Sequence, residues 1–436
     1  MKLSSPVSPT ARPRSLFIVV AFGSAGDVHP MAALAQALQA RRHRVVLLAS
    51  AVFEPLARQL GLAFEPLGSV KDFEDVASHP DMWHPLRGLA AMAPGVEEAN
   101  RLAYAAIARI AAGAAGLPVR LVATTLAFAA RSARDKLGLP LATVHLAPSS
   151  FLSAVDPPAI PGVGIAPWLP LALREGLWWL IERGFIDRWF APGINRLRRE
   201  LALPPVTRVL GRWVHSPDLV IGLFPRWFAP PRIDWPGHLR LTGFPLFDAG
   251  QLSGLSRPLE SFLAAGEAPI VFTAGTAMGL SAAFFARAVE VCRRMNRRGV
   301  LLTRYLDQLP DLPEFVHHER YVPLGQLLPR AVAIVHHGGI GTSAQALAAG
   351  VPQLITPFGF DQFDNAARLR ALGVADSLPQ RAGAARMASH LTALLASTDV
   401  AIACRFASER MPAQGAVLDS TCKLVEGLRQ SSEHPG

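Results

Sequence analysis

The pattern of hydrophobic and polar positions predicts a parallel β-sheet in the first half of the chain. An apolar run at 15–22 leads into a glycine turn at 23–26, a helix at about 30–41 and a second apolar run at 44–49. This order of strand, helix and strand is a βαβ unit. The same rhythm returns with strands at 119–124 and 141–146 and a helix at 127–137. We therefore expect a doubly wound α/β domain here.

The rhythm restarts in the second half. Apolar runs predict strands at 269–273, 299–303, 331–336 and 353–356, and helices at 281–297, 343–349 and 387–397. A chain of 436 residues is too long for one ordinary core. We expect the α/β class, with two Rossmann-like doubly wound domains facing each other across a cleft, which is the GT-B architecture. Ligands then bind at the carboxyl ends of the strands.

Proline-rich stretches mark the expected domain boundary. Four prolines fall within 225–236, and a loose segment with further prolines and glycines covers 255–269. Such segments interrupt regular structure. We expect an N-terminal domain at 1–240, a linker at 241–268, a C-terminal domain at 269–410, and a C-terminal helix and tail at 411–436.

A tryptophan-rich insertion is expected at about 157–200. Trp168, Trp178, Trp179 and Trp189 alternate there with aliphatic residues and arginines. The pattern predicts one or two amphipathic helices. Three interpretations stay open: helices packed on the sheet, a wall of an apolar acceptor groove, or a patch that rests on a membrane.

The composition indicates in which cellular compartment the protein is expected. Mean hydropathy is +0.27, yet no apolar stretch approaches the ~20 residues that a spanning helix needs. The first apolar run ends without a signal-peptide cleavage pattern. Cys292, Cys404 and Cys422 are isolated, which favours a reducing compartment. We expect a cytoplasmic protein.

The net charge of +10 raises the question of nucleic acid. No dense basic block with interleaved aromatic residues occurs, so we expect no nucleic-acid partner. Attraction to an anionic donor, an acidic acceptor or a membrane surface is a simpler explanation. A genome that favours arginine over lysine is the other one.

A glycine-rich turn, His336-His-Gly-Gly-Ile-Gly-Thr342, follows the strand at 331–336 and opens a helix. Glycines let the backbone approach an anion, which the free N–H groups and the positive helix end then bind. We expect this turn to hold a diphosphate. The residues predicted to bind it are His337, Gly339, Gly341, Thr342 and Ser343, with Gly275 and Thr276 as a second, less specific turn.

Asp361 and Gln362 follow the strand at 353–356. A carboxylate beside a carboxamide suits the paired hydroxyls of a sugar, and Asn365 is placed to assist. A helix N-cap is the ordinary explanation for Asp361 alone. Its place soon after the glycine turn and Gly350-Val-Pro352 favours sugar binding instead.

Tyr321, with Val322 beside it, is predicted to stack on a nucleobase. The sequence contains no D-x-D pair, so we expect no metal ion and no cofactor apart from the nucleotide-sugar substrate. The charge of the leaving group must then be met by His337 and the helix start.

Asp27 is the predicted general base. It lies where the first strand of the chain turns into a helix, so it should face the cleft. An aspartate at a helix start is often only a cap, and His29 is the rival base. Pro30 is expected at a first helical position.

These motifs resemble the signature of glycosyltransferase family 1, and the resemblance covers nearly the whole chain. The segment Gly23-Ser-Ala-Gly-Asp-Val28 is similar to the sterol and antibiotic branch. In that branch the aspartate is the base, so the resemblance implies this role for Asp27. One departure is Tyr321-Val-Pro-Leu324, which lacks the glutamine of the family's Trp-x-Pro-Gln element.

A finer resemblance is to the rhamnosyltransferases of bacterial rhamnolipid biosynthesis. It rests on Phe22 to Pro30, His215-Ser-Pro217, Leu223 to Pro231, Asp234-Trp-Pro236, Thr242 to Asp248 and Asp361 to Ala366. It implies inverting transfer of L-rhamnose from dTDP-L-rhamnose to a 3-(3-hydroxyalkanoyloxy)alkanoic acid. It also implies an acyltransferase partner subunit and peripheral contact with the inner membrane.

Two alternatives stay open. One is a sterol, polyketide or other lipid glycosyltransferase that uses a different nucleotide-sugar. The other is a catalytically inactive GT-B protein that serves as a binding or activating partner. The intact Asp27, His337 and Asp361 argue against the second.

Overall fold

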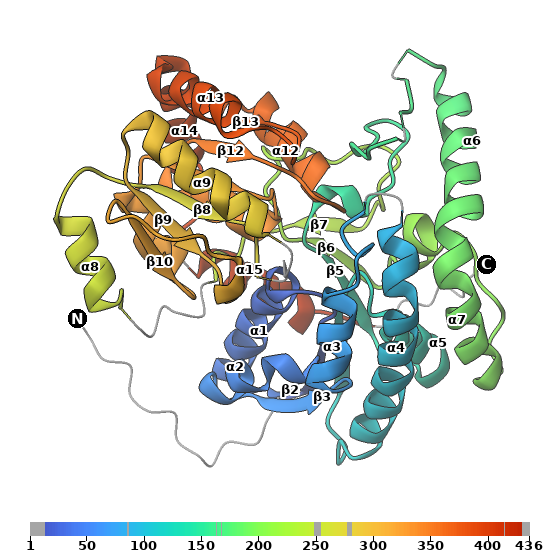
Figure 1. The fold of residues 1–436 in the computed structure, drawn as a ribbon. Coiled ribbons are helices and arrows are strands. Elements are labelled where there is room, and N and C mark those ends of the chain that lie inside the picture. Colours follow the sequence, from blue (N-terminus) through green and yellow to red (C-terminus); the bar gives the residue numbers. More distant parts are fainter. Residues whose placement is uncertain are drawn as a thin grey trace.

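The structure is a computed structural model that describes residues 14–84, 87–162, 164–166, 168–247, 254–276, 281–413 and 415–429. Residues 248–253 of the expected linker, with Asp248 of the finer resemblance, lie outside the described residues, as do 1–13 and 430–436. The described chain forms two parallel sheets flanked by helices (Figure 1). The expected α/β class with two doubly wound domains is confirmed.

The first sheet has seven parallel strands in the order β3-β2-β1-β4-β5-β6-β7. Its strands are β1 (Leu16–Val20), β2 (Arg44–Ala49), β3 (Ala63–Pro66), β4 (Val119–Thr124), β5 (Leu141–His145), β6 (Leu219–Gly222) and β7 (Leu239–Leu241). Since β1 pairs with both β2 and β4, the strand order reverses between β1 and β4. Ligands of doubly wound sheets bind at such a switch point.

The second sheet repeats this topology with six parallel strands in the order β10-β9-β8-β11-β12-β13. They are β8 (Ile270–Thr273), β9 (Gly299–Leu302), β10 (Val316–Glu319), β11 (Ala333–His336), β12 (Gln353–Ile355) and β13 (Ala375–Ser377). The switch point lies between β8 and β11, which pair directly. The turn after β11 is the glycine-rich turn of the sequence.

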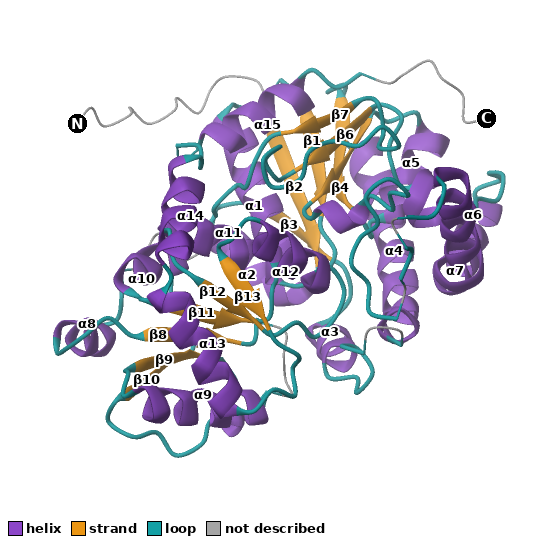
Figure 2. Cartoon of the chain, turned by 90° about the horizontal axis from the view of Figure 1, so that it is seen from above, coloured by secondary structure: helices purple, strands orange, loops and turns teal. Residues whose placement is uncertain are grey.

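Helices cover both faces of the sheets (Figure 2). They are α1 (Ala25–Ala40), α2 (Glu54–Gln59), α3 (Val70–Ala77), α4 (Gly88–Ala112), α5 (Phe128–Leu137), α6 (Leu171–Ile181), α7 (Asp187–Glu200), α8 (Arg257–Ala264), α9 (Ala282–Met295), α10 (Leu324–Leu327), α11 (Ile340–Ala349), α12 (Gln362–Ala371), α13 (Ala384–Ala396), α14 (Thr398–Glu409) and α15 (Ala416–Glu426). None of the described helices is alone long and apolar enough to cross a membrane, although the bent pair α13 and α14 meets both criteria together.

Side chains of β1 alternate between two cores. Phe17 and Val19 pack with Leu34 of α1 and Val425 of α15, and Ile18 packs on the opposite face with Ile107 of α4. All five residues of β1 are buried. A strand covered on both faces reads as a continuous apolar run, which is why the sequence showed it so clearly.

The start of α1 differs from the expectation. The helix begins at Ala25, with Ser24 as the N-cap, and Pro30 lies inside it rather than at its first position. Ser24 and Asp27 form a capping box, in which each side chain bonds the other residue's backbone N–H. This early start places Asp27 in the first helical turn. Similarly, α11 begins at Ile340 and not at Ser343.

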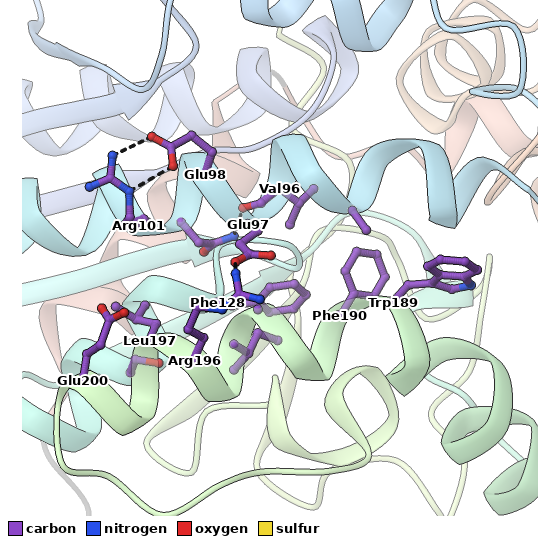
Figure 3. Close-up of a pocket in the computed structure, with 15 residues that line it drawn as sticks. Val96, Glu97, Glu98, Arg101, Phe128, Trp189, Phe190, Arg196, Leu197 and Glu200 are labelled. Carbon is purple, nitrogen blue, oxygen red and sulfur yellow. Dashed lines mark hydrogen bonds and ion pairs between the residues drawn. The ribbon is translucent and has the colours of Figure 1, made fainter.

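A small hollow lies between α4 and α7 (Figure 3). It measures about 70 Å³, which is room for very few waters and far too little for a sugar nucleotide. Glu97 pairs with Arg196 across it, and Arg101 donates to Glu98 at 2.6 Å on α4. Gly193 of α7 permits the close packing, because a Cβ there would lie 2.7 Å from the Glu97 carboxylate. The hollow is a packing feature.

The C-terminal helix α15 returns to the first domain and packs on α1 (Figure 1). Arg41 donates from Nε and Nη2 to the two Glu426 oxygens, both at 2.7 Å, and from Nη1 to Asp419 at 2.8 Å. His43 Nε2 lies 3.0 Å from Glu426 Oε1. Such a bidentate pair fixes geometry as well as adding energy. The end of the chain therefore holds the second domain against the first.

We expect Glu426→Gln to lower the free energy of unfolding by about 1–2 kcal/mol at pH 7, since it breaks the paired hydrogen bonds to Arg41. The hydrogen bond from Arg41 lowers the pKa of Glu426 from 4.5 to about 2. The wild-type contribution is thus present above about pH 4.5 and is lost as pH falls toward 2. Urea unfolding at several pH values measures this.

The matched control is Glu54→Gln, which breaks an exposed pair with Arg58 within α2. Exposed pairs of this kind contribute little. Equal destabilisation by the two substitutions would contradict the proposed role of the Arg41–Glu426 pair.

Candidate functional site

One cavity of about 1130 Å³ lies between the two domains and is lined from both. It exceeds the ~300–1,000 Å³ of a typical ligand pocket, so it has room for a donor and an acceptor together. Twelve of the thirteen predicted site residues line it: Asp27, His29, Gly275, Thr276, Tyr321, Val322, His337, Gly339, Gly341, Thr342, Asp361 and Gln362. Ser343 does not. The fold therefore brings together residues that are over 300 positions apart in the chain.

The glycine-rich turn between β11 and α11 is held in a tight backbone conformation. Gly338 has φ +93°, and a Cβ there would lie 2.9 Å from Ile355 and 3.0 Å from the Gln362 carbonyl oxygen. Gly339 is the N-cap of α11 and has no side chain to satisfy the first N–H groups of the helix. These N–H groups and the helix dipole suit an anion.

Ser343 departs from the expectation. It is fully buried within α11, and its hydroxyl donates to the Gly339 carbonyl oxygen at 3.0 Å. A side chain one turn inside the helix, bonded back to the backbone, is not placed to reach a ligand in the cavity. Thr342, in the first turn, lines the cavity.

His337 packs against both glycine turns. A Cβ on Gly275 would lie 2.9 Å from its ring, and one on Gly339 would collide with Nε2. Its Nδ1 atom is buried without a hydrogen-bond partner in the described part of the chain. Burial lowers the pKa of His337 to about 4, so the ring is neutral at pH 7. Without a bound ligand, it offers a hydrogen bond and not a positive charge.

His336, the other histidine of the turn, has a structural role that the sequence did not show. Its Nδ1 accepts from Gly338 N at 3.1 Å, so its Nε2 carries the hydrogen and donates to Gln353 Oε1 at 3.0 Å. Burial lowers its pKa to about 3, which keeps this neutral form. The first histidine shapes the turn and the second faces the cavity.

Asn365 joins the turn to the predicted sugar-binding residues. Its Nδ2 donates to the Gly338 carbonyl oxygen at 2.9 Å and to Asp361 Oδ2 at 2.8 Å. Asp361 is the N-cap of α12, but its side chain makes no capping bond. The cap interpretation therefore does not explain its carboxylate. Gln362 Oε1 accepts from Phe358 N and Gly359 N, at 2.8 and 3.2 Å, which leaves its amide NH₂ for a ligand.

Asp27 lines the cavity from the first domain. Its Oδ2 accepts from Ser24 N at 2.8 Å and Ser24 Oγ at 3.2 Å, and a Cβ on Gly23 would collide with it. The aspartate does therefore help to form the helix start, as the alternative interpretation held. Both bonds use Oδ2, so Oδ1 is the oxygen left to take a proton.

Two of the acids that line the cavity, Asp27 and Asp361, have raised pKa values. Burial raises the pKa of Asp27 to about 6, against the hydrogen bonds from Ser24, which lower it. Burial and, as the next largest cause, the negative charge of Asp27 together raise the pKa of Asp361 to about 7. A general base works best with a pKa near the working pH, which the value for Asp27 satisfies.

His29 packs among aromatic rings. Its ring meets Phe53 and Phe247 edge-on, with centroids 6.4 and 6.0 Å away. It lines the cavity, so the geometry leaves it as a rival to Asp27. A substitution must decide between the two.

The end of the cavity where a nucleobase is predicted to bind contains two arginines that the sequence did not suggest. Tyr321 is half-exposed and Val322 is buried. Arg304 follows β9 and Arg320 follows β10, and both line the cavity beside Tyr321. No strand was predicted at 316–319, so Arg320 could not be recognised as a residue at a strand's carboxyl end.

The insertion forms one wall of the cavity. After α6, a π-helical turn at Glu182–Ile186 leads into α7. Ile181, Phe185 and Phe190 of this segment line the cavity, and Trp178 is buried. Among the described residues, no cluster of three or more His, Cys, Asp or Glu side chains is placed to hold a metal ion.

Comparison with known proteins agrees with this geometry. The glycosyltransferase family 28 N-terminal domain matches residues 17–150, and the erythromycin biosynthesis protein CIII-like C-terminal domain matches residues 299–418. O-mycaminosyltylonolide 6-deoxyallosyltransferase of Streptomyces fradiae is 30% identical to the chain, covering 96% of it and 99% of that protein. The chain belongs to the GT-B glycosyltransferases.

Solved structures of other glycosyltransferases have the same fold as this chain. The glycotransferase of kitacinnamycin superposes with a TM-score of 0.72 at 21% identity, covering 95% of the chain and 99% of that protein. The spinosyn rhamnosyltransferase SpnG with thymidine diphosphate gives 0.63 at 19% identity, covering 94% and 100%. The expected enzyme class and GT-B fold are confirmed. The finer match to rhamnolipid synthesis stays a prediction.

We expect Asp27→Asn to lower kcat by at least about 100-fold, since the amide cannot take a proton. Asparagine keeps an oxygen that accepts from Ser24 N, so the start of α1 should stay formed. In the wild type, kcat/KM should fall as pH drops below about 6, because the protonated Asp27 is no longer a base. Steady-state rates with an accepted donor and acceptor measure both effects.

His29→Ala is the comparison, with nucleotide affinity by calorimetry as a check on folding. If the histidine variant loses the larger share of kcat while Asp27→Asn stays near the wild-type rate, the base is His29.

Proposed function

We propose that this glycosyltransferase transfers L-rhamnose from dTDP-L-rhamnose to the hydroxyl of a 3-(3-hydroxyalkanoyloxy)alkanoic acid, with inversion and without a metal ion. The observation that carries the transfer reaction is that Asp27 of the first domain and the glycine-rich turn of the second domain line one cavity. A base on one side and an anion-binding turn on the other are the two ends of an in-line displacement.

In the proposed reaction, Asp27 takes the proton of the acceptor hydroxyl as its oxygen attacks the anomeric carbon. The bond from that carbon to the diphosphate breaks on the opposite side. The departing charge is met by the N–H groups at Gly339 to Thr342, by the positive end of α11 and by a hydrogen bond from His337. Asp361 and the amide of Gln362 orient the sugar hydroxyls.

The acceptor class is supported by the lining of the cavity in the first domain. Apolar side chains dominate there, among them Phe53, Phe73, Leu89, Met92, Leu126, Leu152, Phe185 and Phe190. Burying CH₂ groups against such a wall stabilises a bound acyl chain by about 0.8 kcal/mol each. The choice of L-rhamnose as the transferred sugar rests on the finer sequence resemblance. The acceptor contains an ester of two hydroxy acids, so an acyltransferase that forms this ester is the proposed partner.

Product analysis tests the proposal. The purified protein is incubated with dTDP-L-rhamnose or UDP-glucose and with the hydroxyalkanoyloxy acid or a sterol, and products are identified by mass spectrometry. We expect a mono-rhamnosylated acid from the first donor. If only glucose were transferred, the proposed donor sugar would be wrong. If only the sterol were glycosylated, the proposed acceptor would be wrong. If no combination of donor and acceptor gave a glycoside, the result would favour the alternative of a catalytically inactive partner protein.

We also propose that one face of α6 rests on an anionic membrane surface. Leu173, Leu177 and Leu180 are spaced to share one helix face, and all three are exposed, as is the neighbouring Trp179. The exposed Arg183 follows on the same segment. Apolar side chains with adjacent basic ones match a surface of anionic lipid. The helix continues through the turn at Glu182–Ile186 into residues that line the cavity, so an acyl acceptor could pass from the membrane along this segment.

Vesicle flotation tests this surface. We expect the wild type to float with phosphatidylglycerol vesicles and the double variant Leu177→Ser with Leu180→Ser to remain unbound, because two exposed apolar side chains of this face are lost. Phe406→Ser removes a similarly exposed ring on α14 and serves as the control. Flotation that is equal in both variants would contradict the role of α6.

A further inference from the structure

A row of hydrogen-bonded side chains leads from the cavity into the core of the first domain. Thr125 lines the cavity, and its Oγ1 lies 2.9 Å from His145 Nδ1. His145 is fully buried, and its Nε2 lies 2.9 Å from His215 Nδ1. Phe151 covers both rings, edge-on to His145 and stacked on His215. The proposed transfer reaction uses none of the three polar side chains.

Both histidines of the row are neutral. Burial lowers the pKa of His215 to about 3 and that of His145 well below its ordinary value. A neutral imidazole has one donor nitrogen and one acceptor nitrogen. One hydrogen therefore lies between the two rings, and its position sets the direction of the whole row.

The row has two arrangements that carry the same charge. In the first, His215 donates to His145 and His145 Nδ1–H donates to Thr125, so the Thr125 hydroxyl is free to donate into the cavity. In the second, Thr125 donates to His145, and its oxygen can only accept from a ligand. Both arrangements are neutral, so the hydroxyl can match either kind of group without a change in the net charge of the row.

Thr125 and the proposed base follow neighbouring strands of the first sheet. Thr125 directly follows β4, which pairs with β1, and Asp27 lies in the first turn of the helix that follows β1. Thr124 joins the two connections, because its Oγ1 accepts from Phe22 N at 3.0 Å. Asp27 and Thr125 both line the cavity, so one bound acceptor can contact both.

We propose that Thr125, oriented by His145 and His215, is a polar subsite that binds a carboxylate or carbonyl oxygen of the acceptor. The proposal rests on the transfer function proposed above. Leu126, Leu146 and Leu152 also line the cavity on this side, so an oxygen placed among them gains from a hydroxyl donor. Binding the oxygen fixes which hydroxyl of the acceptor faces Asp27. Thr125 is a substrate-binding residue in this scheme, and the two histidines are positioning residues.

The test compares two ligands that differ in one group, a 3-hydroxy fatty acid and the secondary alcohol of equal chain length without the carboxylate. Calorimetry with the nucleotide present measures their affinities and needs no turnover. We expect the wild type to bind the acid at least about tenfold more tightly, and Thr125→Val to lose most of this preference. Valine keeps the size and branching of threonine and removes only the hydroxyl.

Thr421→Val is the matched control. Thr421 is a buried residue of α15 whose hydroxyl donates to the Val417 carbonyl oxygen at 2.7 Å, and it does not line the cavity. The control should keep the preference for the acid. A wild type without this preference, or a loss of equal size in both variants, would overturn the subsite. Because the experiment measures binding of the acceptor, its result does not depend on which sugar the enzyme transfers.

A second measurement tests the histidines. With ¹⁵N-labelled histidine, the acid should shift His145 toward the form with hydrogen on Nδ1, and the alcohol should not. Ring signals that stay unchanged on binding of the acid would show that the row does not respond to the acceptor. His215→Asn should weaken the preference while Thr125 stays in place.

Discussion

The site depends on the backbone turn at Gly338. Its positive φ and the lack of a Cβ let the chain pass close to Ile355 and the Gln362 carbonyl oxygen. Two side chains lock this turn: His336 accepts from the Gly338 N–H, and Asn365 donates to its carbonyl oxygen. The same Asn365 holds Asp361. One turn therefore sets the direction of α11, the position of His337 and the predicted sugar-binding carboxylate together.

Burial gives the cavity its chemistry. His337 loses its charge there, since its pKa is about 4, and Asp27 and Asp361 hold their protons more tightly, with pKa values of about 6 and 7. The glycine-rich turn therefore has no fixed positive side chain. The attraction that we propose for a diphosphate comes from backbone N–H groups and the end of α11, which need no reorganisation when charge develops. A bound diphosphate would in turn favour protonation of His337.

The sequence predicted the interior strands best. The runs at 44–49 and 119–124 matched β2 and β4 residue for residue, because strands covered on both faces are continuous apolar runs. Short strands near the sheet edges, β3, β7 and β13, are more polar and gave no such signal.

The start of α1 was misplaced because Pro30 was taken as a first helical residue, whereas the Ser24–Asp27 capping box marked the true start. Ser343 was misassigned for the same reason: its role depends on where α11 begins. The row from Thr125 to His215 spans three separate segments, and no local pattern connects them.

Both sheets contribute side chains to the cavity at their switch points. This arrangement explains why one domain is proposed to bind the donor and the other the acceptor. In the second sheet, the connections after β8 and β11 carry Gly275 and His337, which we propose bind the donor. In the first sheet, the connections after β1 and β4 carry Asp27 and Thr125, which we propose contact the acceptor. The parallel sheets fix where these loops meet, but the side chains on them are free to vary. The fold therefore accounts for transfer between two bound molecules, while the identity of those molecules depends on a few loop residues and on the apolar wall after α6.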